Sequence, residues 1–461
     1  MTSGDIISED AASTAVSAAI SSAKSIGCRE VEAFVCLTNT KAISIELNNS
    51  VLGSVHRDSQ VFIRLVDKGR MGVAFTNSLK KNDLRRCVSD ARRLAKVSEA
   101  DPRWTGFAEA GRKYPTVRGL CDPRIISLPF KDLKERARMV VDAALAEAVG
   151  ITVTECHLET VTRAIAVGST AGTEASFRDA YISAICGTVM GRGANISPDC
   201  LDGRVSRADD VDFVGLGSSC GSVARNCAVS AEPRTEECQV VFSAGSLGIP
   251  NNGLLNIILS KALSGEGAIQ GTTFLADHVG DRIGPKSMTI VDDPLRTGTV
   301  GSRPLDDEGL PTRRTDLVRE GVFEGFVWNS YHGSVSGKRS TGNAVRDLST
   351  GNVTSAPLNM CMEPGRGTMR DLVSEVDHGY LVWGCQGAHT SNVETGDFSF
   401  VASPGFLIER GAIVGCVRGA MISGNIMDLF SGIEKIGGDI MDCGNATQPS
   451  MLVGGVKITT G

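Results

Sequence analysis

The feature that most constrains the fold is a pair of long, alternating strand-like segments that follow each other directly. Thr152–Val167 and Thr173–Met190 alternate apolar and polar side chains, and only a short glycine-containing turn separates them. A connection this short joins antiparallel neighbours, because parallel strands need a long crossover between them. The two segments therefore predict an antiparallel hairpin in the first half of the chain.

Further strand-like runs, rich in Val, Ile and Phe, precede this hairpin. They are Val31–Leu37, Ala42–Leu47, Gln60–Val66 and Met71–Ala74, with Asn-Asn-Ser, Arg-Asp-Ser and Asp-Lys-Gly-Arg turns between them. Helical periodicity appears in Ala11–Ile26, in Asn82–Val97 with Asn82 as a candidate N-cap, and in Lys131–Val149. Helices combined with an antiparallel meander predict an α+β fold.

The second half of the chain is dominated by short strand and turn patterns. The 461 residues include 53 glycines, which is more than the roughly 7% of an average protein, and glycine readily adopts the positive φ angles of tight turns. We expect an N-terminal helix and antiparallel-sheet domain over residues 1–215 and a β-rich C-terminal domain over residues 216–461. A distorted or open barrel is one candidate architecture for the second domain.

The charge distribution argues against binding to nucleic acids. The net charge is −6, and the most basic stretch, Lys80–Lys96, alternates its charges with Leu84, Val88, Ala91 and Leu94. This spacing is typical of an amphipathic helix with a solvated face, whereas nucleic-acid binders usually carry a clustered basic surface.

The cysteines and the N-terminus indicate a cytoplasmic protein. The 14 cysteines include no C-x-x-C pair, the first residues show no secretory signal, and no stretch of about 18 apolar residues could cross a membrane. We therefore expect reduced, mostly buried thiols and no membrane partner.

Candidate sites for metal chemistry are weak when they are judged from the residues alone. The six histidines form no H-E-x-x-H motif, and the pairs Cys156/His157 and Cys385/His389 lack the further ligands that zinc requires. The acidic groups Asp292-Asp293 and Asp306-Asp307-Glu308 could bind a hard cation, but their flanking Gly and Pro residues favour turns.

A serine-hydrolase motif is the alternative. Gly217-Ser218-Ser219-Cys220-Gly221 matches G-x-S-x-G, in which Ser219 would be the nucleophile at a strand-to-helix turn. The surrounding segments show no alternation of strands and crossover helices, so the pattern also fits a serine-rich helix N-terminus.

Several longer motifs, in a fixed order, are more specific. They are Val291-Asp292-Asp293-Pro294, Gly301-Ser302-Arg303-Pro304-Leu305-Asp306-Asp307-Glu308-Gly309-Leu310-Pro311-Thr312-Arg313-Arg314-Thr315, Ser340-Thr341-Gly342-Asn343-Ala344-Val345-Arg346, Glu394-Thr395-Gly396-Asp397-Phe398-Ser399 and Ile422-Ser423-Gly424-Asn425. Together with the Gly69–Asn77 stretch of the N-terminal meander, they resemble the TldD/PmbA family, whose members were once called modulators of DNA gyrase. The resemblance covers nearly the whole chain.

In that family the TldD-type subunit carries an H-E-x-x-x-H zinc motif on a helix, followed by a Leu-x-Gly-acidic stretch. Anchored on Leu263-Ser264-Gly265-Glu266, the two ligand positions of this chain hold Asn256 and Lys261, and the position of the general base holds Ile257. A cation repels zinc and an alkyl side chain cannot move a proton, so this departure resembles the PmbA (TldE) branch. Cys443 lies near the third ligand of the TldD branch and is a weak metal candidate.

The resemblance implies a non-catalytic subunit of a heterodimeric zinc metallopeptidase that acts on unfolded or extended peptides. Zinc would then belong to a TldD-like catalytic subunit, and we expect no cofactor in this chain. The alternatives are an autonomous peptide-binding homodimer without catalysis, a hydrolase that uses Ser219, and a protein that controls a DNA topoisomerase.

Overall fold

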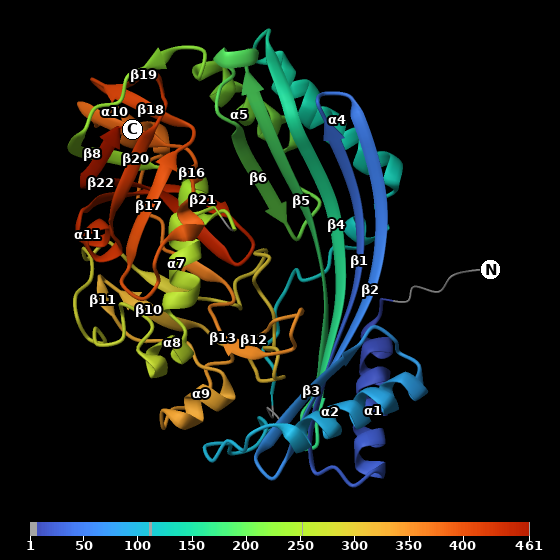
Figure 1. The fold of residues 1–461 in the computed structure, drawn as a ribbon. Helices are drawn as coiled ribbons and strands as arrows, with labels where there is room; N and C mark the ends of the chain where they lie inside the picture. The colour runs from blue at the N-terminus through green and yellow to red at the C-terminus, as the bar shows by residue number, and fades with distance from the viewer. Residues whose placement is uncertain (1–6, 110–112, 251, 461) are drawn as a thin grey trace.

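The computed structural model describes residues 7–109, 113–250 and 252–460. Its N-terminal unit (residues 7–226) is built on a six-stranded antiparallel sheet with the order β3-β2-β1-β4-β5-β6 (Figure 1). The strands are β1 (Glu30–Glu46), β2 (Ser50–Asp67), β3 (Arg70–Thr76), β4 (Ile151–Ser169), β5 (Glu174–Met190) and β6 (Cys200–Ser206). The predicted hairpin is confirmed, since β4 and β5 pair along almost their whole length.

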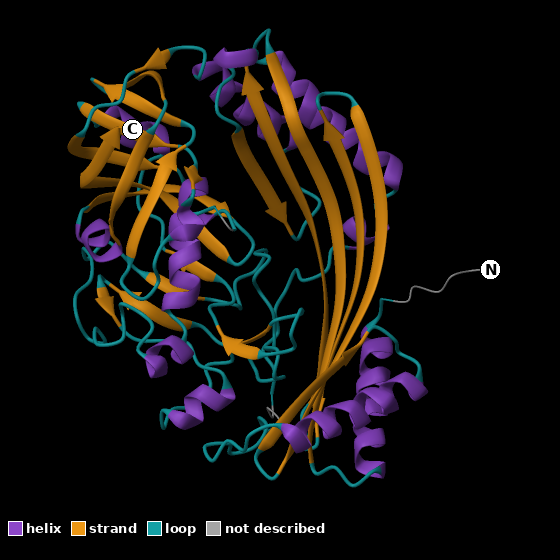
Figure 2. Cartoon of the chain, in the orientation of Figure 1, coloured by secondary structure: helices purple, strands orange, loops and turns teal. Residues whose placement is uncertain are grey.

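Helices cover the face of this sheet that is turned away from the rest of the chain (Figure 2). They are α1 (Glu9–Ser25), α2 (Lys81–Val97), α3 (Pro123–Ser127), α4 (Phe130–Ala146) and α5 (Phe213–Asn226), with a 3₁₀ turn η1 (Gly193–Asn195) before β6. Apolar side chains at helical spacing on α1 and α2 pack on the odd-numbered residues of β1, such as Val35. The even-numbered residues, such as Phe34, point to the opposite face, as alternation along a strand requires.

Three local expectations were wrong. β1 is one continuous strand rather than two, and Arg57–Ser59 form part of β2 rather than a turn. These polar stretches pair in register across β1 and β2, with Thr38 opposite Asp58, so backbone pairing outweighs their low strand propensity. The helix α2 is capped at Lys80 without a side-chain hydrogen bond, and Asn82 lies inside its first turn.

The C-terminal unit (residues 230–460) is a large mixed sheet of 14 strands with short helices around it. The strand order β11-β10-β9-β14-β22-β8-β15-β18-β19-β7 has branches through β16, β17, β20 and β21, and within the described residues this pairing path does not close into a barrel. Most of the pairs are antiparallel, whereas β14/β22, β8/β15 and β7/β19 are parallel. The expected α+β class with a β-rich second half is therefore confirmed, with an open sheet as its architecture.

The strands of this sheet are β7 (Ser230–Ala231), β8 (Glu236–Phe242), β9 (Ile290–Asp292), β10 (Thr315–Arg319), β11 (Val322–Phe323), β14 (Met360–Met362), β15 (His378–Val382), β16 (Cys385–Gln386), β17 (Asp397–Ala402), β18 (Gly405–Glu409), β19 (Ala412–Val417), β20 (Ala420–Asn425), β21 (Ile433–Asp442) and β22 (Ala446–Thr460). A separate hairpin consists of β12 (Ala344–Arg346) and β13 (Val353–Ser355). The helices are α6 (Ala244–Gly248), α7 (Leu254–Ala262), α8 (Gly265–Gln270), α9 (Ser330–Val335), α10 (Met369–Ser374) and α11 (Ile426–Ser431), with a 3₁₀ turn η2 (Ala388–Thr390).

A buried ion network joins the two units. Arg64 on β2 donates to both carboxylate oxygens of Glu32 on β1, at 2.9 and 2.7 Å, and to Glu308 of the C-terminal unit at 3.2 Å. Arg346 of β12 donates to Glu32 from the other side, and all four residues are at most 5% exposed. Glu308 and Arg346, each from one of the sequence motifs, thus fix the position of one unit against the other, because removing one partner would leave a buried charge unpaired.

The predicted boundary between residues 215 and 216 would cut α5. This helix packs with α4 and the first sheet through Phe213, Leu216 and Cys220, so we propose a boundary after Asn226 instead.

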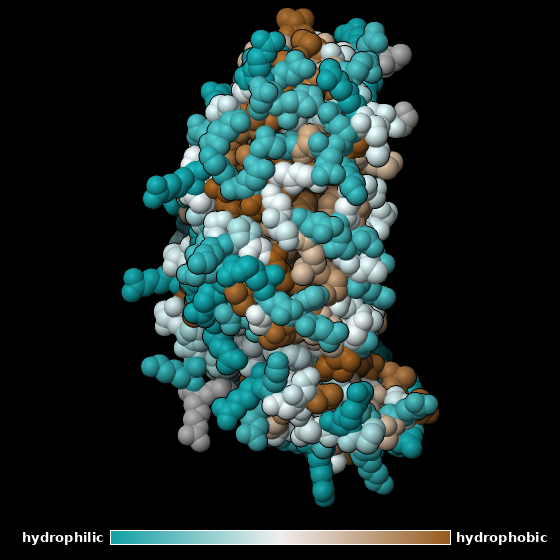
Figure 3. All heavy atoms as spheres, turned by 90° about the vertical axis from the view of Figure 1, so that its left-hand side faces the viewer, coloured by the Kyte–Doolittle hydropathy of each residue, from teal (hydrophilic) through white to brown (hydrophobic). Residues whose placement is uncertain are grey.

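No helix among the described residues is long and apolar enough to span a membrane. The outer face of the C-terminal unit is mostly hydrophilic, with apolar residues in small groups (Figure 3).

Candidate functional site

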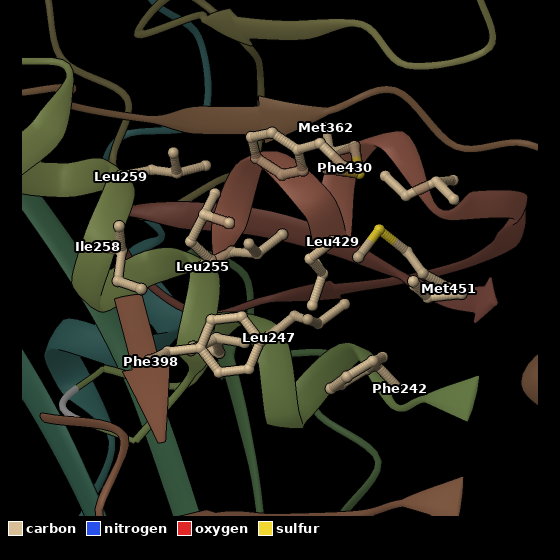
Figure 4. Close-up of a cluster of buried hydrophobic side chains, with 14 of the residues drawn as sticks. Phe242, Leu247, Leu255, Ile258, Leu259, Met362, Phe398, Leu429, Phe430 and Met451 are labelled. Carbon is tan, nitrogen blue, oxygen red and sulfur yellow. The ribbon is translucent and has the colours of Figure 1, made fainter. Parts of the chain in front are cut away.

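The helix that carries the candidate zinc-motif positions is α7, and one of its faces is part of the hydrophobic core. Leu255, Ile258 and Leu259 recur at helical spacing and are at most 2% exposed. Figure 4 shows these side chains packed among residues of other elements, including Phe398 from β17 and Phe430 from α11. The core therefore fixes the rotation of α7 and determines where its remaining side chains lie.

Asn256 lies beside this core face and is held by four hydrogen bonds. Its Nδ2 donates to the carbonyl of Gly248 at 2.7 Å and to Oδ1 of Asn445 at 3.0 Å. Its Oδ1 accepts from Oγ of Ser260 at 2.8 Å and from Nδ2 of Asn445 at 3.2 Å. The side chain is 4% exposed, so the first ligand position is occupied by an amide whose donors and acceptors are satisfied by the protein.

The other two positions of the motif do not converge on this amide cluster. Ile257 is half-buried and packs against the main core. Lys261, in the last turn of α7, is exposed to solvent. An alkyl group and a solvated ammonium group offer no lone pair that could bind a metal ion.

Cys443 lies close to Asn256, as the motif comparison suggested. Both residues adjoin Gly248: a Cβ atom at this glycine would come within 2.7 Å of the Cys443 Sγ, while the Gly248 carbonyl accepts from Asn256. Burial raises the pKa of the Cys443 thiol, which is therefore neutral at pH 7. One thiol beside the amides of Asn256 and Asn445 does not supply the three or four Cys, His or carboxylate donors that zinc requires, so these residues do not fit a zinc ion.

Elsewhere the structure separates the candidate ligand pairs. Cys156 points from β4 toward α4, with its Sγ 3.6 Å from the Ala137 carbonyl, whereas His157 points to the opposite face. Cys385 is buried and His389 is exposed. Within the ranges that the structure describes, no group of three or more His, Cys, Asp or Glu side chains could hold a metal ion.

The acidic groups serve the backbone of turns. Asp306 accepts from the backbone N–H groups of Glu308, Leu310 and Ala344, at 2.8 to 3.0 Å. Asp292 accepts from two backbone N–H groups and from the side chain of Asn343, and burial raises the pKa of Asp292 to about 6. The turn interpretation of these groups is therefore supported over cation binding.

Ser219 does not lie on a nucleophile elbow. The sequence Gly217–Gly221 is in the middle of α5, and the Ser219 hydroxyl donates to Asp202 at 2.8 Å. A Cβ atom at Gly217 would meet the Val140 carbonyl at 2.1 Å. The glycines of the G-x-S-x-G pattern thus permit the close approach of α5 to α4, which a larger residue would prevent.

An extended concave surface between the two units forms a groove that the sequence did not reveal. Three adjoining depressions, of about 310, 260 and 410 Å³, share lining residues such as Leu201 on β6 and Ile249 after α6. β6 is the last strand of its sheet, and within the described residues it pairs with β5 and leaves its other edge open. Trp383 of the C-terminal unit donates across the groove to the Leu201 carbonyl at 3.2 Å.

The groove suits an extended chain better than a compact molecule. An edge strand presents backbone N–H and C=O groups that another strand can pair with. The walls combine apolar side chains such as Ile249 and Trp383 with charged ones such as Asp202, Arg204 and Asp442. This mixture offers contacts to a peptide backbone and to both apolar and charged side chains.

Comparison with known proteins identifies the family. Residues 235–460 match the model of the PmbA/TldA metallopeptidase C-terminal domain, and residues 31–95 match that of the PmbA/TldA metallopeptidase domain 1. The crystal structure of TldE from Thermococcus kodakarensis superposes with a TM-score of 0.89 at 26% identity, over 97% of this chain and 100% of that one.

Two relatives from Haemophilus influenzae match most of the chain. The metalloprotease PmbA homolog is 24% identical over 96% of this chain and 95% of its own length. The metalloprotease TldD homolog is also 24% identical, over 83% of this chain and 80% of its own length. The resemblance drawn from the motifs is confirmed at the level of the family, and the chain belongs to the PmbA/TldD metallopeptidase family.

Proposed function

We propose that this chain is a non-catalytic, PmbA/TldE-type subunit of a two-subunit zinc metallopeptidase, in which a TldD-type partner holds the zinc and the general base. The observation that carries the proposal is the set of side chains on α7. Asn256 and Lys261 stand at the positions of the two zinc ligands, and Ile257 stands at the position of the general base. The similarity to TldE over nearly the full chain supports the same assignment.

Zinc binding at α7 is prevented by the packing around the helix as well as by the identity of the three side chains. Asn256 is locked by the Gly248 carbonyl and Asn445, and Lys261 faces solvent. Recovering a metal site would require a different arrangement of this cluster as well as new donors. The chain thus keeps the scaffold of the family while its local contacts support a structural role for the helix.

The contribution of this subunit to the complex would be the enclosure and binding of substrate. We infer that unfolded or extended peptides lie in the groove beside β6, where main-chain pairing gives affinity without strong sequence preference.

All 14 cysteines are free, 11 of them buried, which supports a reducing, cytoplasmic location.

The test is co-expression of this chain with the TldD-type chain from the same genome, followed by digestion of a set of unstructured peptides. We expect cleavage by the mixture and none by either the chain alone or its homodimer. Cys443 and Ser219 line the groove, so Cys443→Ser and Ser219→Ala in this subunit can alter substrate affinity, but neither should abolish cleavage by the mixture. Cleavage by the purified chain alone, abolished by either of these substitutions, would overturn the proposal.

A further inference from the structure

We propose that a second pocket, at the opposite end of the interface from the groove, binds an organic cation that carries an ammonium or guanidinium group. The pocket has a volume of about 500 Å³. Its lining comes from both units: β2, β3 and the segment after α2 on one side, and α8, α9 and the β12–β13 hairpin on the other. The inference does not depend on the zinc chemistry or on the partner subunit proposed above.

An aromatic wall is the first observation that supports it. Trp104 and Tyr331 stack with ring centroids 6.2 Å apart and planes 26° apart, and His332 adjoins Tyr331 at 5.1 Å. The indole N–H of Trp104 donates to Glu30 at 2.7 Å, and Phe107 packs edge-on against the indole. These contacts hold the rings in position before any ligand arrives, which lowers the entropy cost of binding.

The wall already attracts one positive charge. The guanidinium of Arg103 lies over the Tyr331 ring at 5.9 Å. Aromatic faces carry negative electrostatic potential, and sites that recognise organic cations commonly combine such faces with carboxylates. The Tyr331 hydroxyl also donates to Asp101, which fixes a carboxylate at the edge of the wall.

Uncompensated carboxylates are the second observation. Glu99, Glu266 and Asp347 line the pocket, and within the described part of the chain no Lys or Arg lies within ion-pair distance of them. Glu266 accepts from the neutral side chains of Thr354 and Gln270, and Asp347 from neutral groups of its own turn.

The cation that lines the pocket is already neutralised. Arg64 is held by Glu32 and Glu308. Arg103, which lies over the Tyr331 ring, pairs with Asp101 at 3.4 Å. Glu99, Glu266 and Asp347 therefore leave the pocket with an excess of negative charge, which a cationic ligand would balance.

His332 adds no positive charge to the pocket. Burial lowers the pKa of this imidazole, so the neutral ring is favoured at pH 7. Its Nδ1 is shielded from solvent and is not accessible to a ligand. The accessible charged groups of the pocket are therefore mainly carboxylates, which accept hydrogen bonds. An ammonium group with three N–H donors, or a guanidinium group with five, matches this set.

Titration calorimetry on the full-length protein at low ionic strength tests the inference, because partly exposed charges are screened by salt. The probes are Nα-acetyl-arginine amide, agmatine, and Nα-acetyl-citrulline amide as the neutral isostere. We expect saturable binding of at least one cation and none of the citrulline compound. Tighter binding of the arginine amide would identify a peptide side chain as the source, and tighter binding of agmatine a free amine.

Two variants locate the binding. Glu266→Gln and Asp347→Asn keep the shape of the side chain and remove its charge. Glu266→Gln should weaken cation binding by about fivefold, and the exposed Asp347→Asn by about twofold. Glu394→Gln, on the exposed turn before β17, is the matched control and should bind like the unmodified protein. Equal binding of the cation and its neutral isostere, absence of saturable binding by both cations, or unchanged affinity in both pocket variants would overturn the inference.

Discussion

Replacement of Asn256 by Ala should destabilise the C-terminal unit measurably, although the residue is polar and lies on a short helix. The substitution removes the donor to the buried Gly248 carbonyl and the bonds with Ser260 and Asn445. Asn445 is exposed and Ser260 is half-buried, so water can replace their lost partner. The Gly248 carbonyl is buried and would be left without this partner.

The expected loss of unfolding free energy follows from which groups stay without a hydrogen-bond partner. A buried polar group that loses its partner costs roughly 1–3 kcal/mol, and a typical net hydrogen bond contributes about 0.5–1.5 kcal/mol. We therefore expect a loss of about 2–3 kcal/mol. For a unit of about 150–250 residues each kcal/mol shifts the melting temperature by about 2–4 °C, so the decrease should be about 4–12 °C.

Differential scanning calorimetry of matched variants provides the assay. Asn445→Ala removes the exposed side of the same cluster and should cost less than about 1 kcal/mol. Lys261→Ala alters a solvated side chain and should stay within about 0.5 kcal/mol of the unmodified protein. If Asn256→Ala melts together with Lys261→Ala, the amide cluster does not hold α7 and our explanation of this position is wrong.

Two further predictions concern the N-terminal unit. Gly217→Ala should lower stability by about 1–3 kcal/mol, since its Cβ would overlap the Val140 carbonyl, whereas Ser219→Ala should change the melting temperature little; equal effects would contradict the helix-packing explanation. Burial alone would raise the pKa of Glu32, but Arg64 and a second guanidinium more than offset it and hold the pKa below its usual value. The stability from this carboxylate is therefore present above about pH 4.3 and is lost as the pH falls further. Melting curves from pH 7 to 3.5 should show a smaller acid-induced loss in Glu32→Gln than in the unmodified protein, and equal losses would refute this assignment.

Local patterns predicted the regular parts of the fold. The β4–β5 hairpin follows from unbroken alternation and from a turn in which Gly172 adopts a φ of 97°. The helix α1 ends at Ser25, and Gly27, two residues later, adopts a φ of 79° that a helix cannot continue through. In these segments the local preference and the tertiary environment agree, so the sequence is sufficient.

Polar segments on strands were harder to predict. β6 was missed because its residues line a groove and therefore lack the apolar alternation of a buried strand, and the Arg57–Ser59 stretch of β2 was assigned to a turn for a similar reason. Both lie at sheet edges or beside solvent, where pairing with a neighbouring strand decides the conformation.

The features that the sequence did not predict depend on contacts between residues far apart in the chain. The pairing of Glu32 with Arg346 joins positions more than 300 residues apart, and no local spacing signals it. At the candidate zinc site, the motif comparison indicated which side chains replace the ligands. It did not show that Asn256 binds the Gly248 carbonyl or that Lys261 faces solvent, because both depend on how α7 packs against its neighbours.

Zinc stoichiometry of the co-purified complex, measured by native mass spectrometry, tests the central proposal most directly. We predict a heterodimer that carries zinc, which separates on gas-phase dissociation into a zinc-bound TldD-type chain and this chain without metal. Zinc retained by this chain, with its occupancy lost on Cys443→Ser, would contradict the account.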